Sequence, residues 1–169
     1  AIKNQKQLAF SHDNNPMLYG FNEVIDFNCI KPGDISTATS SMLKDTDHIL
    51  TDILKVNHIR RTFENTLIRV DDLYDNVSKM WNLIELLSST HPSEEIRNEA
   101  DENDLKIQEY MIDLSINEDL YKCMLAYSEL KEAQELRGYR KRFLESELKD
   151  FKRSGMELKV NERDKLKEI

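Results

Sequence analysis

The four histidines of the chain are the residues with which zinc-peptidase chemistry could begin, because a catalytic zinc is often held by two histidines of a His-Glu-x-x-His motif on one helix face. None of His12, His48, His58 and His91 is followed directly by Glu. Asp45 and His48 come nearest to the Glu-x-x-His pair of a four-helix di-iron centre. A single pair with Asp in place of Glu more often forms a hydrogen bond on a helix surface. We therefore predict no metal-binding residue in this chain.

No other arrangement of side chains supplies a catalytic residue. Ser11-His12 and Ser115 lack the spacing that would bring together a nucleophile, a base and a group that orients the base. The chain contains neither Gly-x-x-x-x-Gly-Lys nor Gly-x-Gly-x-x-Gly, so no phosphate-binding loop is expected. Aromatic side chains could stack on a ligand, but their helical spacing favours packing in the core: Trp81, Tyr74, Tyr110, Tyr121 and Tyr127. The residues alone predict no catalytic and no cofactor-binding residue.

The charge of the chain argues against nucleic acid as a partner. The 169 residues contain 24 Lys and Arg against 32 Asp and Glu, a formal net charge of −8, which repels a phosphate backbone. The most basic segment, Arg137 to Arg142, is followed by Lys149, and acidic residues are interleaved throughout. This pattern is typical of a solvated helix face.

The sequence shows no pattern typical of a membrane span or of a secretory signal. No run of about 18 apolar residues occurs, so we expect no membrane span, and residues 1–18 have no apolar segment behind a basic one, as a secretory signal would. Cys29 and Cys123 are far apart and belong to no Cys-x-x-Cys or Cys/His cluster. We expect two free, buried thiols in a reducing compartment, and therefore a cytoplasmic protein.

The fold class follows from the scarcity of turn-forming residues and from the apolar period. Four Gly and three Pro are too few for a many-stranded sandwich or barrel. From Asp34 onward, apolar residues recur at steps of three and four, as in amphipathic helices. We predict an all-α fold, an antiparallel helical bundle of about five helices plus a truncated sixth. Residues 1–33 are expected to form an irregular lead-in, and residues 34–169 a helical domain.

Capping residues and glycines set the expected helix boundaries. The predicted helices cover residues 34–57, 63–88, 94–116, 117–130, 134–154 and, cut short, 161–169. Thr62, Ser93 and Asn117 are predicted N-caps, because their side-chain oxygens can accept an amide hydrogen of the first turn. Gly155 suits the left-handed residue after a helix end. Gly138 falls inside the helix predicted at 134–154 and should cost it about 1 kcal/mol relative to Ala.

One apolar stripe is the most regular pattern in the sequence. Its seven residues alternate steps of four and three: Phe63, Leu67, Val70, Tyr74, Val77, Trp81 and Ile84. A long helix buries such a seam against its neighbours. We expect this stripe at the centre of the core, with the helices at 34–57, 63–88, 94–116 and 134–154 long and antiparallel. Replacing Trp81 by Ala should then cost about 3–5 kcal/mol.

The C-terminal segment is expected to lack its natural support. Asn161 to Ile169 begins a helix and ends after about two turns, which is too short to be stable alone. Together with a first residue other than Met, this indicates a piece of a longer polypeptide. We expect self-association through Met156, Leu158, Leu166 and Ile169 with parts of the lead-in, and fast amide exchange across residues 159–169 in a monomer.

Four segments in a fixed order carry a resemblance to a known family: Thr62-Phe-Glu-Asn-Thr-Leu67, Leu87 through His91-Pro-Ser-Glu-Glu-Ile-Arg-Asn-Glu-Ala100, Ser115-Ile-Asn-Glu-Asp-Leu-Tyr121, and Leu148-Lys-Asp-Phe-Lys-Arg-Ser-Gly-Met-Glu-Leu158. Together they resemble the N-terminal region of the thimet-oligopeptidase family of zinc metallopeptidases, which includes neurolysin, oligopeptidase A and mitochondrial intermediate peptidase. The lead-in from Phe21 to Asp34 resembles the family's opening, so the likeness spans residues 16–169. The sequence departs from the family at Arg69, where relatives commonly have Pro, and at Lys159, where a capping residue is common.

The resemblance implies a division of labour within a larger enzyme. It ends before the family's His-Glu-x-x-His motif, so it transfers no catalytic or zinc-binding residue to this chain. It implies that the chain forms a wall of a deep channel that admits short, unstructured peptides, while zinc and the general base lie in the missing catalytic lobe of the same polypeptide. An acidic wall would favour basic or amine-terminated peptides.

A different class of protein remains as the alternative. The chain would then be a free-standing helical protein-interaction module without enzymatic activity, which uses the stripe from Phe63 to Ile84 to bind a partner helix. The residues alone favour this alternative, and the resemblance favours the peptidase. A full-length sequence distinguishes the two, because a His-Glu-x-x-His motif is either present or absent downstream.

Overall fold

The computed structural model describes residues 15–18 and 25–156, and this part of the chain is all-α, as predicted. Its α-helices are α1 (Asp34–Lys55), α2 (Ile68–Thr90), α3 (Glu94–Ser115), α4 (Glu118–Ser128), α5 (Lys131–Glu135) and α6 (Gly138–Arg153). Three short 3-10 turns, η1 (Pro16–Leu18), η2 (Phe27–Cys29) and η3 (His58–Arg60), lie between or before them. A π-helical turn, η4 (Phe63–Leu67), runs directly into α2.

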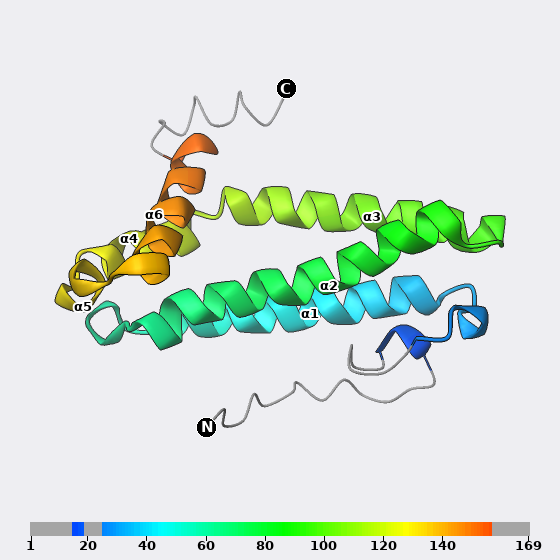
Figure 1. Cartoon of the computed structure of the whole chain (residues 1–169), viewed down its shortest axis with the longest axis horizontal. Coiled ribbons are helices and arrows are strands. Elements are labelled where there is room, and N and C mark those ends of the chain that lie inside the picture. The colour runs from blue at the N-terminus through cyan, green and yellow to red at the C-terminus, as the bar shows by residue number, and fades with distance from the viewer. Residues whose placement is uncertain (1–14, 19–24, 157–169) are drawn as a thin grey trace.

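Three long helices determine the shape of the domain. Figure 1 shows α1, α2 and α3 side by side along the longest axis, each running opposite to the one before it. The shorter helices α4, α5 and α6 gather at the end where α1 stops and α2 begins. In the same view α6 stands across the long helices. The expected antiparallel set therefore contains α1, α2 and α3, but the segment predicted at 134–154 does not join it.

The core divides into two clusters along the long helices. The lead-in cluster joins η1 and Ile30 to the first half of α1, to residues 77–87 of α2 and to residues 96–107 of α3: Met17, Leu18, Ile30, Ile35, Ala38, Met42, Val77, Met80, Leu83, Ile84, Leu87, Ile96, Ala100 and Ile107. The junction cluster joins the opposite ends of the long helices to α4, α5 and α6: Ile49, Ile53, Phe63, Leu67, Val70, Leu73, Leu114, Leu120, Met124, Tyr127, Ala133, Leu136, Leu144, Phe151 and Met156.

The apolar stripe lies in this core, with two exceptions. Five of its residues are buried, but Tyr74 and Trp81 are only half-buried. The indole Nε1 of Trp81 donates to Asp104 at 2.5 Å. Because α2 packs against both α1 and α3, it buries Leu73, Met80 and Leu87 in addition. The expectation that Trp81 lies at the centre of the core is wrong, since an aromatic ring with a polar tip is stable at the edge of a core.

The predicted caps at Thr62 and Asn117 are confirmed. Thr62 forms a capping box with Asn65: the Asn65 amide donates to Thr62 Oγ1 at 3.2 Å, and the Thr62 amide donates to Asn65 Oδ1 at 2.8 Å. Asn117 Oδ1 accepts the Leu120 amide at 2.9 Å. Both caps satisfy amides that have no partner inside the helix.

Ser93 is not the side-chain cap that the sequence predicts. It occupies the N-cap position of α3, but its side chain makes no capping hydrogen bond. Its own backbone amide donates instead to Nδ1 of His91, at 3.2 Å. The ring of His91 therefore closes the turn between α2 and α3.

The helix predicted over 134–154 is interrupted near its start. The chain is extended at Leu136 and Arg137, which places Leu136 in the junction cluster. Gly138 has a φ of +62° and begins α6, so it does not lie inside a helix as expected. Without this break α5 and α6 would be collinear, and α6 could not cross the ends of the long helices.

The end of α6 agrees with the prediction. Gly155 has a φ of +87°, and the Met156 amide donates to the Phe151 carbonyl at 3.2 Å. These are the features of a Schellman motif, in which an apolar residue before the turn and one after it also pack together. Here these residues are Phe151 and Met156, which belong to the same core cluster. The helix predicted at 161–169 and Leu158 lie outside the described residues.

Part of the predicted lead-in packs against the helices. Met17 and Leu18 are buried in the same cluster as residues of α1. The division of the chain into two parts at residue 33 stays a prediction. None of the helices in the described ranges combines the length and the apolarity that a membrane crossing requires.

Candidate functional site

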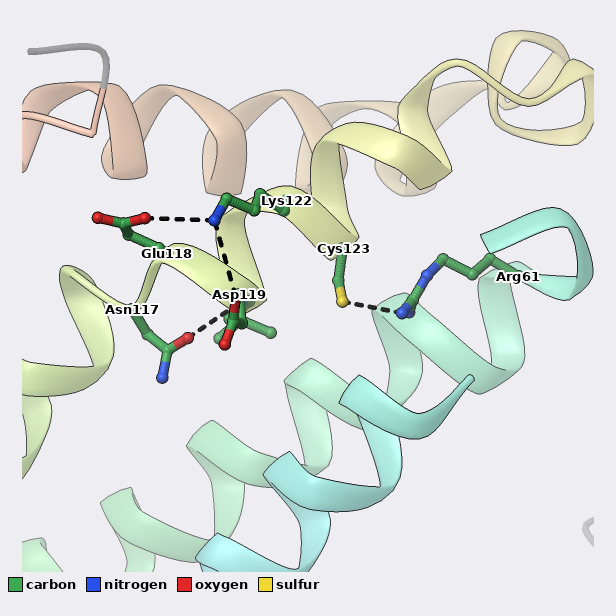
Figure 2. Close-up of polar contacts among 7 residues, drawn as sticks. Arg61, Asn117, Glu118, Asp119, Lys122 and Cys123 are labelled. Carbon is green, nitrogen blue, oxygen red and sulfur yellow. Dashed lines mark hydrogen bonds and ion pairs between the residues drawn. The ribbon is translucent and has the colours of Figure 1, made fainter. Parts of the chain in front are cut away.

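The junction between the long helices and α4 contains a buried, incompletely satisfied arginine. Arg61 lies in the extended connection between η3 and the Thr62 capping box, and only 4% of it is exposed. Its Nη2 donates to the Val56 carbonyl at 3.0 Å and lies 2.8 Å from Cys123 Sγ. Figure 2 shows the guanidinium directed at the sulfur. Within the described ranges, Nε and Nη1 have no hydrogen-bond partner.

Cys123 approaches this arginine from α4. Its side chain is half-buried, and burial raises the pKa of its thiol, although the positive charge of Arg61 opposes this effect. The Asp119 carboxylate, one turn earlier on α4, raises the pKa further. Cys123 is therefore a neutral thiol at neutral pH, and it leaves the charge of Arg61 uncompensated.

The exposed side of α4 carries ordinary surface ion pairs. Lys122 contacts Glu118 at 3.2 Å and Asp119 at 3.8 Å, as Figure 2 shows. Such exposed pairs at helical spacing contribute only a few tenths of a kcal/mol. The unusual feature of this region is the buried guanidinium.

A second group of contacts ties the start of η4 to α5 and α6. The Phe63 amide donates to Glu132 Oε1 at 3.1 Å. The Arg140 guanidinium carbon lies 4.3 Å from the centre of the buried Phe63 ring, a cation–π arrangement. Tyr127 is fully buried and its hydroxyl has no partner among the described residues; burial raises the pKa of Tyr127 to about 12. These residues fix the position of the capping box.

The crossing of α6 over α2 contains a carboxyl group with a perturbed pKa. Burial raises the pKa of Glu147 to about 7, although a hydrogen bond with the Tyr74 side chain acts in the opposite direction. The neighbouring carboxylates of Asp150 and Asp71 raise it further. Burial and the same Glu147 carboxylate also raise the pKa of Tyr74. No imidazole or nucleophile completes a catalytic arrangement with Glu147 among these contacts.

A shallow acidic hollow of about 480 Å³ opens at the opposite end of the domain. It is lined by Pro32 and by residues from the first turns of α3: Glu94, Glu95, Asn98, Glu99 and Glu102. The Glu99 carboxylate accepts the amides of Gly33 and Ser36, both at 2.9 Å. The hollow is therefore the rim of a helix cap, and it has no buried polar group directed at a ligand.

The histidines and the Asp45-x-x-His48 pair are not assembled into a metal site in the described part of the chain. His48 and His58 are exposed, and the ring of His91 lies 3.3 Å from the Phe27 carbonyl. No three His, Cys, Asp or Glu side chains of residues 15–18 and 25–156 approach closely enough to hold a metal ion. His12 lies outside the described residues.

The other candidates serve local structure. Ser115 Oγ donates to the Ile112 carbonyl at 2.7 Å, whereas Ser11 lies outside the described residues. The aromatic side chains contact neighbouring helices: Tyr110 donates to Asp47 at 3.0 Å, and the ring centres of Tyr121 and Phe151 are 5.7 Å apart. Packing, the interpretation that their spacing favours, is what the structure shows.

Sequence reasoning missed three residues: Arg61, Glu99 and Glu147. Each acts on a residue far away in the sequence, so no local motif marks it. The available signal was a charged residue close to apolar ones, since Arg61 lies two residues from both Ile59 and Phe63. That signal is weak, because a charged residue in such a place is usually solvated.

Comparison with known proteins agrees on one family. The model of the N-terminal domain of neurolysin/thimet oligopeptidase matches residues 39–163. A thimet-like oligopeptidase of Dictyostelium discoideum is 29% identical over 152 residues, which are 87% of this chain and 22% of that protein. Oligopeptidase A of Haemophilus influenzae is 29% identical over 159 residues, 92% of this chain and again 22% of the relative. The chain thus spans about a fifth of the length of these curated relatives.

Proposed function

Because the chain belongs to the family of neurolysin/thimet oligopeptidase N-terminal domains, we propose that it is the non-catalytic N-terminal lobe of a zinc metallopeptidase that hydrolyses short peptides. The observation that carries this proposal is the family match over residues 39–163. The two relatives, both oligopeptidases by name, support it over most of the chain.

The described residues do not fit a zinc centre, so the chemistry is assigned elsewhere in the polypeptide. Peptide hydrolysis in such an enzyme needs a metal-bound water and a general base, and no set of ligands for a metal is assembled within residues 15–18 and 25–156. The partner of this lobe is therefore the catalytic lobe of the same polypeptide. Zinc is a cofactor of that lobe in this proposal.

The contribution of this chain is to exclude folded substrates. The long helices α1, α2 and α3 all contribute to both core clusters, and such a packed element is rigid enough to form one wall of a narrow channel. A rigid wall admits an extended peptide and rejects a folded domain. The net charge of −8 favours basic or amine-terminated peptides through its field, and we place the enzyme in the cytoplasm.

The test uses the full-length polypeptide. We expect a His-Glu-x-x-His motif downstream of this chain, zinc in the purified enzyme, and cleavage of a quenched short peptide. The 169-residue chain alone should be inactive and should contain no stoichiometric zinc. A full-length sequence without the motif would refute the proposal.

A second measurement tests the wall itself. The same cleavable peptide is offered free and inserted into a loop of a stable folded protein. We expect the full-length enzyme to cleave only the free form. Equal cleavage of both forms would leave the family membership intact but would refute the role in substrate exclusion.

The alternative, a free-standing interaction module, loses the surface on which it depends. Phe63, Leu67, Val70, Val77 and Ile84 of the apolar stripe are buried within the chain's own core. A partner helix could reach them only if the domain opened. The peptidase lobe is therefore the better supported function.

A further inference from the structure

We propose that Cys123 is a site of oxidation by peroxide, at which the guanidinium of Arg61 holds the resulting sulfenate. This inference is independent of the proposed peptidase function. It rests on the geometry between the η3–η4 connection and α4 shown in Figure 2.

The first argument is the uncompensated charge of Arg61. A guanidinium is always protonated and has five N–H donors, and a buried charge without an anionic partner is costly. Arg61 is 96% buried, since 4% of it is exposed, and no carboxylate of the described residues is hydrogen-bonded to it. Its contacts are one carbonyl and one sulfur, and Nε and Nη1 have no partner in the described ranges. Among the described residues, therefore, no anion with oxygen acceptors is hydrogen-bonded to this guanidinium.

The second argument is the identity of the atom that Arg61 faces. A neutral thiol sulfur is a weak acceptor, although it lies only 2.8 Å from Nη2. An oxygen bound to this sulfur would be a strong acceptor within reach of the same guanidinium, and its negative charge would pair with Arg61. Charge-assisted hydrogen bonds are about twice as strong as neutral ones.

The reaction needs only a peroxide as co-reactant. The Cys123 thiol first releases its proton to solvent, because the thiolate is the nucleophile. Sγ then attacks one oxygen of hydrogen peroxide, an S–O bond forms, and the O–O bond breaks. The leaving hydroxide takes a proton from solvent and departs as water, so that the sulfur is oxidised by two electrons and the peroxide is reduced. The sulfenic acid, the first product of thiol oxidation, then loses its proton to solvent because Arg61 stabilises the anion.

Cys29 provides an internal comparison with the opposite charge. It is exposed, so the prediction that both cysteines are buried is wrong at this position, and its Sγ donates to Asp26 Oδ2 at 3.3 Å. A carboxylate disfavours an anion on the neighbouring sulfur, and the hydrogen bond to Asp26 raises the pKa of this thiol. Exposure alone would make Cys29 the preferred site, whereas electrostatic stabilisation of the product makes Cys123 preferred. Comparing the sulfenate fractions at Cys29 and Cys123 therefore distinguishes exposure from electrostatic stabilisation as the factor that determines the site of oxidation.

The experiment treats the full 169-residue chain with limiting hydrogen peroxide, removes the excess with catalase, and traps both thiol and sulfenate with NBD chloride. Peptide mass spectrometry then gives the sulfenate fraction at each cysteine. We expect a larger fraction at Cys123 than at Cys29. Arg61→Gln should lower the fraction at Cys123 by about tenfold, the factor that corresponds to one charge-assisted hydrogen bond. Arg60→Gln, which changes the exposed neighbouring arginine, should leave both fractions unchanged.

A variant that keeps Arg61 covers the case in which Arg61→Gln does not fold. Asp119→Asn removes the carboxylate that acts on Cys123 from one turn away, and it should raise the sulfenate fraction at Cys123 without changing that at Cys29. The proposal is overturned if Cys29 holds most of the sulfenate in the unmodified chain. It is also overturned if a folded Arg61→Gln variant shows the same sulfenate fraction at Cys123 as the unmodified chain. An unchanged or lower fraction at Cys123 in Asp119→Asn would also overturn it.

Discussion

The side chain of Glu99, in the second turn of α3, caps the N-terminus of α1 by accepting the Gly33 amide at 2.9 Å. Its second carboxylate oxygen accepts the Ser36 amide, also at 2.9 Å. Gly33 has no side chain with which to cap the helix, and its φ is +94°. The first turn of α1 is therefore completed by a residue 66 positions away in the sequence.

Replacing Glu99 by Ala should destabilise the domain. The change leaves two amides of α1 without their acceptor and removes a negative charge from the positive end of the helix dipole. We expect a loss of about 1–2 kcal/mol in the free energy of unfolding, measured by urea denaturation. Glu102→Ala, at an exposed position on the same helix, is the control and should change the free energy of unfolding by less than about 0.5 kcal/mol. Equal effects of the two changes would contradict the capping role.

Truncation of Trp81 should cost less than truncation of the smaller Ile84. Ile84 is fully buried, so Ile84→Ala removes core contacts and leaves a cavity, at a cost of about 2–5 kcal/mol. Trp81 is half-buried, so Trp81→Ala should cost about 1–2 kcal/mol, part of it from the lost bond to Asp104. Urea midpoints of the two variants decide the order. A larger loss for Trp81→Ala would place the indole back in the core.

Gly138→Ala should destabilise the domain. At a φ of +62° an Ala residue is strained by about 1–2 kcal/mol, even though an added Cβ would meet no atom within 4 Å. Asn tolerates this conformation better than Ala, so Gly138→Asn should cost less. Thermal or urea unfolding of the two variants checks the order. Stabilisation by Ala would instead indicate a glycine in the interior of a helix.

Glu147 should make the domain less stable as the pH rises. Its pKa is about 7 in the folded chain against an ordinary value of 4.5, so between these values the folded state binds more protons than the unfolded state. The stabilisation contributed by protonated Glu147 is therefore fully present below pH 4.5 and is lost as the pH rises through about 7. We expect this group to contribute a decrease of about 2 kcal/mol, after allowance for partial exposure to solvent.

The variant Glu147→Gln isolates this contribution. It cannot ionise, so it should be more stable than the unmodified chain at about pH 8 and should lose the decrease between about pH 5 and pH 8. Urea unfolding at these two pH values measures the difference. Glu145→Gln, on the exposed side of α6 where Glu145 pairs with Lys141 at 3.7 Å, is the matched control. A decrease that persists in Glu147→Gln would assign the pH dependence to other groups.

The sequence by itself determined the features that arise from neighbours along the chain. The periodic apolar residues predict α1, the combined η4–α2 helix and α3 to within a few residues. The caps at Thr62 and Asn117 and the stop at Gly155 are equally local, since each hydrogen bond closes within five residues. The family was also determined at this level, because ordered segments such as Thr62-Phe-Glu-Asn-Thr-Leu67 are properties of the sequence itself.

The tertiary structure alone decided how these helices meet. The crossing of α6, the position of Trp81 at the edge of the core, and the contacts of Glu99 with Gly33 and of Arg61 with Cys123 depend on packing angles that no local period encodes. Arg61 and Cys123 are separated by 62 residues, and each looks like an ordinary residue of its own segment. Their chemistry arises only when the core closes around them, because burial removes the water that would otherwise solvate the charge.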